Sequence, residues 1–132
     1  MGKGYNRRFI LRIKEMPKVK GDVLKDPVLQ KIVEIIVKEF DPDKIILFGS
    51  RARGDYNEHS DYDILVLKEG LEDKLKREME DRIRFRLMEE NIYNFCDVDI
   101  IVQSPRKFRI LRKYPYRIYY YIAKEGKVLY EK

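Results

Sequence analysis

Two acidic residues at alternate positions mark the part of this sequence that could do chemistry. Asp61 and Asp63 flank Tyr62 and precede the apolar run Ile64-Leu65-Val66. Side chains alternate between the faces of a strand, so the two carboxylates point the same way, about 7 Å apart, and repel each other. A hard divalent cation between them would relieve this repulsion, because such cations prefer oxygen ligands. The pair therefore predicts a metal site at the start of a strand.

Ten residues separate a glycine–serine pair from the first of these acids. Gly49-Ser50 follows the apolar run Ile45-Ile46-Leu47-Phe48 and precedes Arg51-Ala52-Arg53-Gly54. A glycine lets the backbone come close to a ligand, and the amides that open a helix after Ser50 can hold phosphate. Phosphate binding beside one strand and carboxylates on the next indicate a site for a nucleotide and a metal ion.

A second pair of alternating carboxylates, Asp97 and Asp99, leads into the apolar residues Ile100-Ile101-Val102. The two acids share one face of the expected strand. A carboxylate in an apolar strand is costly unless it is paired or bound to a metal. We therefore expect this pair to face a cation or another charged group.

The motif Gly49-Ser50, ten residues, then Asp61-Tyr62-Asp63 resembles the signature of the polymerase-beta-type nucleotidyltransferases. With Arg51-Ala52-Arg53-Gly54 and Ser60-Asp61, the stretch is similar to the minimal nucleotidyltransferase (MNT) branch, whose members are small stand-alone domains. The resemblance covers about residues 27–131, and its specific motifs are confined to residues 47–66 and 97–102. The alternative interpretation is a plain turn followed by a solvated strand end.

The resemblance implies transfer of AMP from ATP with the help of two Mg²⁺ ions. Asp61 and Asp63 would hold the ion that carries the triphosphate. The segment Val98-Asp99-Ile100-Ile101 looks like the family's third-carboxylate segment. It favours Asp99 over Asp97 as the residue that completes the second metal site and helps to deprotonate the acceptor hydroxyl.

The same resemblance assigns the phosphate-binding residues. Gly49 and Ser50 would bind the β and γ phosphates through amides and the Ser50 hydroxyl. Arg51 and Arg53 are candidate phosphate clamps, because a guanidinium matches phosphate oxygens in pairs. For each arginine the alternative is a surface residue near the start of a helix.

MNT proteins are known for pairing with small helical HEPN proteins, which are RNA-cleaving toxins. In such pairs the nucleotidyltransferase silences the toxin by transferring AMP to a tyrosine. The resemblance therefore implies an antitoxin enzyme with a HEPN-type toxin as its partner. Two alternatives stay open, a non-catalytic nucleotide-binding subunit that inhibits by contact and nucleotidyl transfer to a small molecule. A homodimer and direct nucleic-acid binding also stay open.

The elements around these motifs predict a small α/β (α+β) fold with a mixed sheet and helices mainly on one face. We expect a basic N-terminal extension at residues 1–26, with a short strand at 7–13, and a nucleotidyltransferase domain at residues 27–132. Asp26-Pro27 and Ser104-Pro105 are typical helix starts. Strands are expected at 44–48, 62–67, 95–102 and 127–130, with the first and third of these beside the second. A long helix over 71–91 carries the apolar stripe Leu71, Leu75, Met79, Ile83 and Leu87.

The composition fits one globular domain, since 44% of the 132 residues are hydrophobic and 39% are charged. The net charge of +6, with many of the cations between Arg106 and Arg117, favours contact with nucleotides, RNA or an acidic protein. A single cysteine, Cys96, excludes an internal disulfide and suits a reducing compartment. No apolar run is long enough to span a membrane, and the N-terminus lacks the apolar core of a signal peptide. We therefore expect a cytoplasmic protein without a membrane partner.

Overall fold

A computed structural model of the chain describes residues 25–94 and 96–132. The strand expected at residues 7–13 lies outside the described residues. The elements, in chain order, are α3 (Pro27–Phe40), β1 (Lys44–Phe48), α4 (Ser50–Arg53), β2 (Tyr62–Leu67), α5 (Asp73–Glu89), the 3₁₀ turn η1 (Ile92–Asn94), β3 (Val98–Gln103), α6 (Pro105–Leu111), α7 (Ile118–Glu125) and β4 (Lys127–Glu131).

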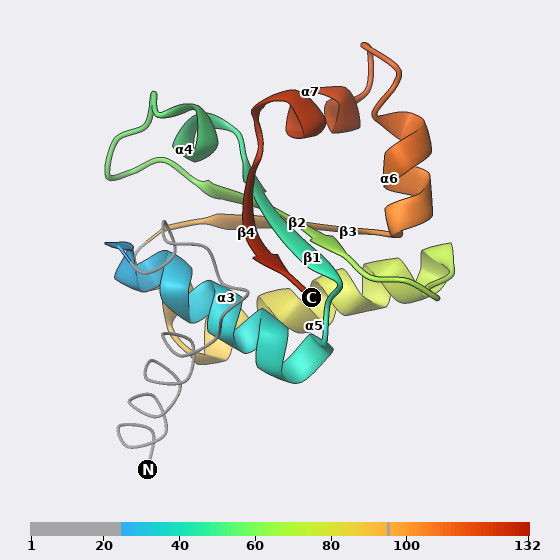
Figure 1. Cartoon of the computed structure of the whole chain (residues 1–132). Coiled ribbons are helices and arrows are strands. Elements are labelled where there is room, and N and C mark those ends of the chain that lie inside the picture. The colour runs from blue at the N-terminus through green and yellow to red at the C-terminus, as the bar shows by residue number, and fades with distance from the viewer. Residues whose placement is uncertain (1–24, 95) are drawn as a thin grey trace.

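The four strands form one mixed sheet in the order β3-β2-β1-β4. Strand β1 runs antiparallel to both β2 and β4, whereas β2 and β3 are parallel. A parallel pair needs a crossover connection, and α5 provides it between β2 and β3 (Figure 1). The expected placement of β2 between β1 and β3 is therefore confirmed.

The two longest helices cover one face of the sheet, and shorter helices lie on the other (Figure 1). The larger core joins α3 and α5 to alternate strand residues such as Ile45 and Ile64. A smaller cluster on the opposite face joins Phe108 of α6 and Ile122 of α7 to residues such as Leu65. This arrangement confirms the mixed α/β fold and shows why β1 and β2 are apolar on both faces.

Side-chain caps fix the starts of two helices where the sequence predicted them. Asp26 accepts hydrogen bonds from the amides of Val28 and Leu29 at 3.0 and 3.1 Å, and Pro27 is the first residue of α3. Ser104 accepts from the amide of Lys107 at 3.1 Å at the start of α6. A proline fits the first helical position because its missing N–H would have no partner there.

The predicted apolar stripe departs from the structure at one member, Leu75, while Leu71 packs against the core from just before the helix. Met79, Ile83 and Leu87 are buried, but the side chain of Leu75 is 43% exposed. Residues four apart rotate by about 40° per step around a helix, so Leu75 has turned about 120° away from Leu87. Lys76 is buried in its place, and its ammonium donates to Gln103 Oε1 at 2.6 Å and to Asp73 Oδ1 at 3.0 Å.

The bounds of several elements also differ from the prediction, most of all at two starts. The helix begins at Asp73 rather than at 71, and the third strand begins at Val98 rather than at 95. Within the described ranges, no helix has the length and apolar character needed to cross a bilayer.

Candidate active site

The register of the parallel strands brings two predicted catalytic acids together. Asp63 of β2 lies directly opposite Asp99 of β3. Desolvation by burial raises the pKa of Asp63 from 3.8 to about 6, and the hydrogen bond and charge of Asp99 and the charge of Asp61 act in the same direction. The charge of Arg53 acts against them. Both other predicted carboxylates therefore act on Asp63, and Asp99 is its hydrogen-bonded partner.

The glycine of the Gly-Ser turn packs directly against Asp63, one member of this pair. A Cβ atom built on Gly49 would lie 2.2 Å from Asp63 Oδ2, closer than any real side chain could approach. Gly49 also has a φ of 74° and a ψ of −157°, a backbone conformation that residues with a Cβ rarely adopt. Only glycine fits here, and the turn and the carboxylate pair therefore form one continuous site.

Helix α4 begins immediately after this glycine. The first amides that bond within the turn are those of Ala52 and Arg53, which both donate to Gly49 O at 3.1 Å. The amides of Ser50 and Arg51 precede them, at positions that have no intrahelical acceptor. Amides of this kind beside Asp63 could hold phosphate oxygens next to a metal ion.

The donor chemistry of the site fits a hard divalent cation. Asp61 and Asp99 both line a cavity of about 350 Å³. Its other lining residues are Arg84 and Met88 of α5, Tyr93, Asp97 and Val98. Carboxylate oxygens are the ligands that Mg²⁺ prefers. In the part of the chain that the structure describes, no three acidic, histidine or cysteine side chains are already arranged around one point as metal ligands. An ion would therefore have to bring these carboxylates closer together when it binds.

Asp97 lies outside the strand ladder. It precedes β3, its side chain is exposed, and its carbonyl accepts the amide of Tyr62 at 3.0 Å. The residue opposite Asp63 is Asp99. The register therefore favours Asp99 as the third carboxylate, while Asp97 only accepts a main-chain hydrogen bond from the first residue of β2.

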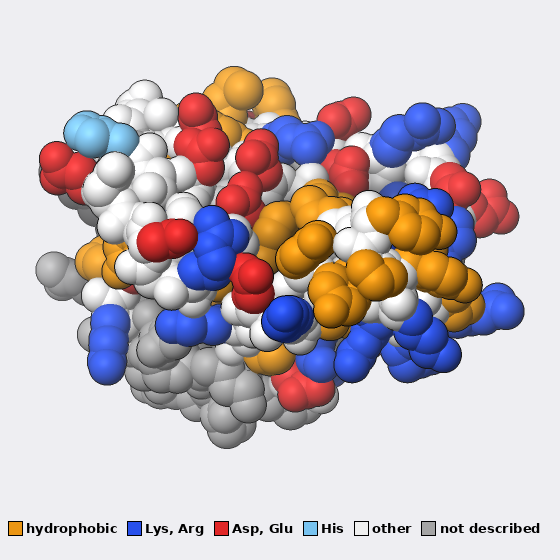
Figure 2. Space-filling view, turned by 90° about the horizontal axis from the view of Figure 1, so that it is seen from above, with side chains coloured by type: hydrophobic (Ala, Val, Ile, Leu, Met, Phe, Trp, Pro, Cys, Tyr) orange, Lys and Arg blue, Asp and Glu red, His pale blue; other side chains and the backbone are white. Residues whose placement is uncertain are grey.

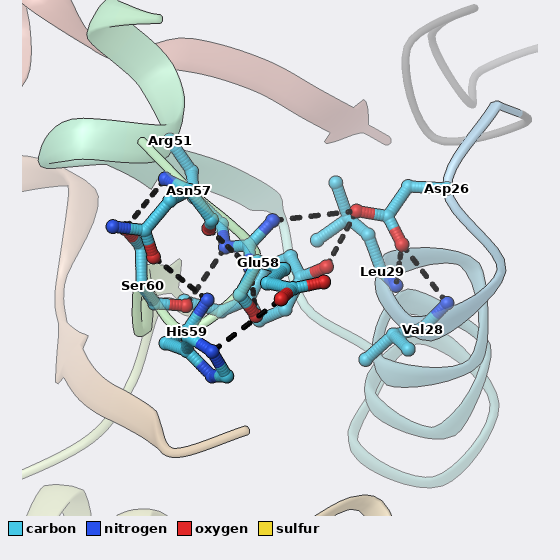
Figure 3. A network of polar contacts seen from close by, with 9 residues as sticks. Asp26, Val28, Leu29, Arg51, Asn57, Glu58, His59 and Ser60 are labelled. Carbon is cyan, nitrogen blue, oxygen red and sulfur yellow. Dashed lines mark hydrogen bonds and ion pairs between the residues drawn. The ribbon is translucent and has the colours of Figure 1, made fainter. Parts of the chain in front are cut away.

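The structure places the two candidate phosphate clamps in different surroundings. The side chain of Arg53 is 44% exposed, lies within 3.3 Å of Asp55 and 3.5 Å of Glu125, and its charge lowers the pKa of Asp63. The side chain of Arg51 is only 9% exposed. Its Nε donates to the carbonyl of Ser60 at 3.0 Å (Figure 3). Arg53 thus lies close enough to act on Asp63 while it pairs with two acids, whereas the donors of Arg51 point to main-chain carbonyls.

Sequence reasoning missed a partly buried hydrogen bond that links β2 to the residue that caps α3. Tyr62 is 3% exposed, and its hydroxyl donates to Asp26 Oδ2 at 2.5 Å. Burial is the largest cause that raises the pKa of Tyr62, followed by this hydrogen bond. The alternation that puts Tyr62 on the core face was visible in the sequence, and a buried hydroxyl needs a partner. That signal could have pointed to the hydrogen bond, although not to Asp26.

Comparisons with known proteins agree with this geometry. The family model "Polymerase beta, Nucleotidyltransferase" matches residues 30–132. Two relatives from Methanocaldococcus jannaschii are provisionally named protein adenylyltransferases. One is 51% identical over 47 residues, covering 28% of this chain and 46% of the relative. The other is 75% identical over 24 residues, covering 18% of this chain and 24% of the relative. The chain thus spans less than half the length of the curated relatives it matches.

A solved structure also shares the fold. A toxin–antitoxin structure with AMP-PNP superimposes with a TM-score of 0.50 at 22% identity, covering 78% of this chain and 73% of that chain. The likeness extends through most of the described elements, whereas the family match includes the Gly49-Ser50 turn and the acids Asp61, Asp63 and Asp99. The expected resemblance to the polymerase-beta-type nucleotidyltransferases is confirmed, and the chain belongs to that family.

Proposed function

We propose that this nucleotidyltransferase moves AMP from ATP, with Mg²⁺, to a hydroxyl group of a partner protein. The acceptor is a tyrosine of a HEPN-type toxin, and the transfer makes the chain an antitoxin. The observation that carries the chemical part is the close approach of Gly49 to Asp63, which lies opposite Asp99; this puts the turn proposed to bind phosphate beside carboxylates. The names of the two relatives and the toxin–antitoxin with AMP-PNP support the acceptor and the nucleotide.

Each residue of the site has a role in this transfer. Asp61, Asp63 and Asp99 would hold two Mg²⁺ ions, which stabilise negative charge on the attacking and leaving oxygens. The amides after Gly49 and the Ser50 hydroxyl bind the β and γ phosphates. Asp99 takes the proton from the acceptor hydroxyl, whose oxygen forms a bond to the α-phosphorus as the bond to pyrophosphate breaks.

The raised pKa of Asp63 gives this binding a pH dependence. Asp63 has to give up its proton before its carboxylate can bind a cation. With a pKa of about 6, the metal-free site holds this proton in mildly acidic solution. Metal binding therefore competes with protons and strengthens as the pH rises through about 6.

The acceptor protein would dock on the surface formed by α6 and α7. The segment between Ser104 and Glu125 contains seven lysines and arginines and no acidic residue. Large apolar side chains are exposed on it, including Ile110, Ile118 and Tyr116, the last at 77%. Figure 2 shows hydrophobic side chains gathered among Lys and Arg side chains on the face seen from above. An apolar centre with a basic rim suits a partner with an acidic rim.

The ion pair between Arg53 and Glu125 connects this surface to the site. It joins α4, which follows Gly49, to the last residue of α7 at 3.5 Å. A partner on α6 and α7 would therefore lie near the nucleotide. The non-catalytic subunit that inhibits by contact remains the second candidate, because the same surface would serve it without any transfer.

Co-expression with a HEPN-type protein and intact-mass analysis of that protein tests the proposal. A gain of about 329 Da, the mass of one added AMP, is expected with the wild-type chain and not with Asp61→Asn, because transfer depends on the metal. Glu69→Gln, which removes an exposed charge elsewhere, is the control and should transfer normally. An unmodified partner that Asp61→Asn still silences would establish inhibition by contact.

A further inference from the structure

Asp61 is exposed, but one residue, Arg51, contacts the chain on both sides of it. The carbonyl of Ser60, which forms the peptide bond to Asp61, accepts a hydrogen bond from Arg51 Nε at 3.0 Å. On the other side, the Arg51 guanidinium lies 3.9 Å from the centre of the Tyr62 ring. Arg51 therefore contacts both chain neighbours of a predicted metal ligand.

The same guanidinium holds the loop that leads to Asp61. Its Nη2 donates to the carbonyls of Asn57 and Glu58 at 3.3 and 3.5 Å. Within the loop, the amide of Ser60 donates to Asn57 O at 3.1 Å, and the amide of Asn57 donates to Ser60 Oγ at 3.0 Å. The loop is thus a closed turn that is fastened to the domain through Arg51.

The opposite side of Arg51 faces the start of α3. Its Nη1 lies 4.0 Å from Asp26 Oδ2, the oxygen that also accepts the Tyr62 hydroxyl. The other oxygen of Asp26 caps α3 through the amide of Val28. Arg51 therefore links the metal-site strand to the helix layer on the far face of the sheet.

We propose that Arg51 is a positioning residue that sets the place of Asp61 for metal binding, and that it does not bind phosphate. The inference rests on the proposed role of Asp61 as a metal ligand. A guanidinium suits this task because its donors form a rigid planar fork and its faces stack on aromatic rings. A side chain that is 9% exposed could reach a phosphate only by giving up these contacts.

The proposed role needs an arginine at this position. A lysine ammonium is a compact point charge on a flexible stem, so it can contact one or two of these carbonyls but cannot also cover the Tyr62 ring. Arg51→Lys therefore keeps the charge and loses the hold on the loop, whereas Arg51→Met keeps much of the side-chain volume and loses both.

The test compares Arg51→Lys and Arg51→Met with Arg82→Met, which removes a guanidinium that lies 5.5 Å from the Phe40 ring on another part of the domain. Mn²⁺ affinity is measured by electron paramagnetic resonance at a temperature where every variant is folded. Hydrogen exchange of the amides of Ser60 and Tyr62 is measured without metal. We expect both Arg51 variants to bind Mn²⁺ about 10-fold or more weakly and to exchange faster, because ligand-orienting residues have effects of that size. Arg82→Met should match wild type in both.

Other results would overturn the inference. Arg51 variants that melt earlier but keep wild-type Mn²⁺ affinity and exchange would show a purely structural role. Variants that lose ATP affinity with Mn²⁺ affinity and exchange unchanged would show a phosphate clamp. If Asp61→Asn binds Mn²⁺ as well as wild type, the proposed metal role of Asp61 fails. In that case, faster exchange in the Arg51 variants still supports the hold on Asp61, and unchanged exchange refutes it.

Discussion

Replacing Asp63 with asparagine should stabilise the metal-free protein at neutral pH, although it removes a proposed catalytic group. The pKa of Asp63 is raised to about 6 in the folded protein, above the value of 3.8 for a free side chain. For an acid shifted in this direction, folding favours the protonated form. Its contribution to stability is fully present below pH 3.8 and is lost as the pH rises through about 6. Asparagine cannot ionise, so Asp63→Asn avoids this loss.

The size of the effect follows from the same pKa difference. At about 1.4 kcal/mol per pKa unit, the change from 3.8 to about 6 corresponds to about 3 kcal/mol. Water screens a carboxylate that is only partly buried, so we expect a gain of roughly 1–2 kcal/mol. For a domain of this length, that gain raises the melting temperature by about 4–8 °C.

Thermal unfolding in EDTA, followed by circular dichroism at about pH 4 and about pH 8, measures the gain. Asp63→Asn should melt higher than wild type at the upper pH and close to it at the lower. Asp81→Asn, which removes an exposed carboxylate on α5, is the control and should show no such difference. Mg²⁺ should raise the melting temperature of wild type more than that of Asp63→Asn. A gain that is the same at both pH values, or a loss at the upper one, would refute the reasoning.

Three further outcomes are expected. Gly49→Ala should lower the free energy of unfolding by at least about 2 kcal/mol, because its Cβ would meet Asp63 Oδ2 in a strained backbone, and urea unfolding would measure this. Asp99→Asn should stop transfer yet keep much of the ATP affinity in calorimetry, whereas Asp61→Asn should weaken metal-dependent ATP binding; equal losses of affinity would contradict the separate roles. Association with the acceptor protein should slow as salt rises, and Arg112→Glu should slow it most at low salt in stopped-flow measurements. An association rate that does not depend on salt would contradict the proposed attraction between the basic surface and an acidic partner.

Features that depend on a few neighbouring residues were visible in the sequence. Asp26-Pro27 and Ser104-Pro105 predicted two helix starts correctly, because a capping side chain and a proline act within one helical turn. The apolar runs of β1 and β2 also predicted these two strands with the correct bounds. Leu75 was placed wrongly because a four-residue repeat does not keep one face of a helix; Lys76, which hydrogen-bonds to Gln103 and Asp73, is buried in its place.

The site itself depends on contacts that no spacing rule contains. The strand register, which depends on tertiary packing, favours Asp99 over Asp97 as the third carboxylate. The partners of Arg51 include three main-chain carbonyls, and carbonyls look alike whatever residues carry them. The residue types of the site could therefore be predicted, but the different placements of Arg51 and Arg53 could not.

The parallel pairing of β2 with β3 also affects when the site comes into existence. Strands β1 and β2 are antiparallel neighbours and can pair early, but Asp63 meets Asp99 only after α5 has crossed the sheet and docked. An incompletely folded chain thus has the Gly-Ser turn without the acid pair. Interactions that form late in folding mainly slow unfolding when they are strengthened. A cation bound between the two strands would therefore prolong the lifetime of the finished fold and leave the folding rate nearly unchanged.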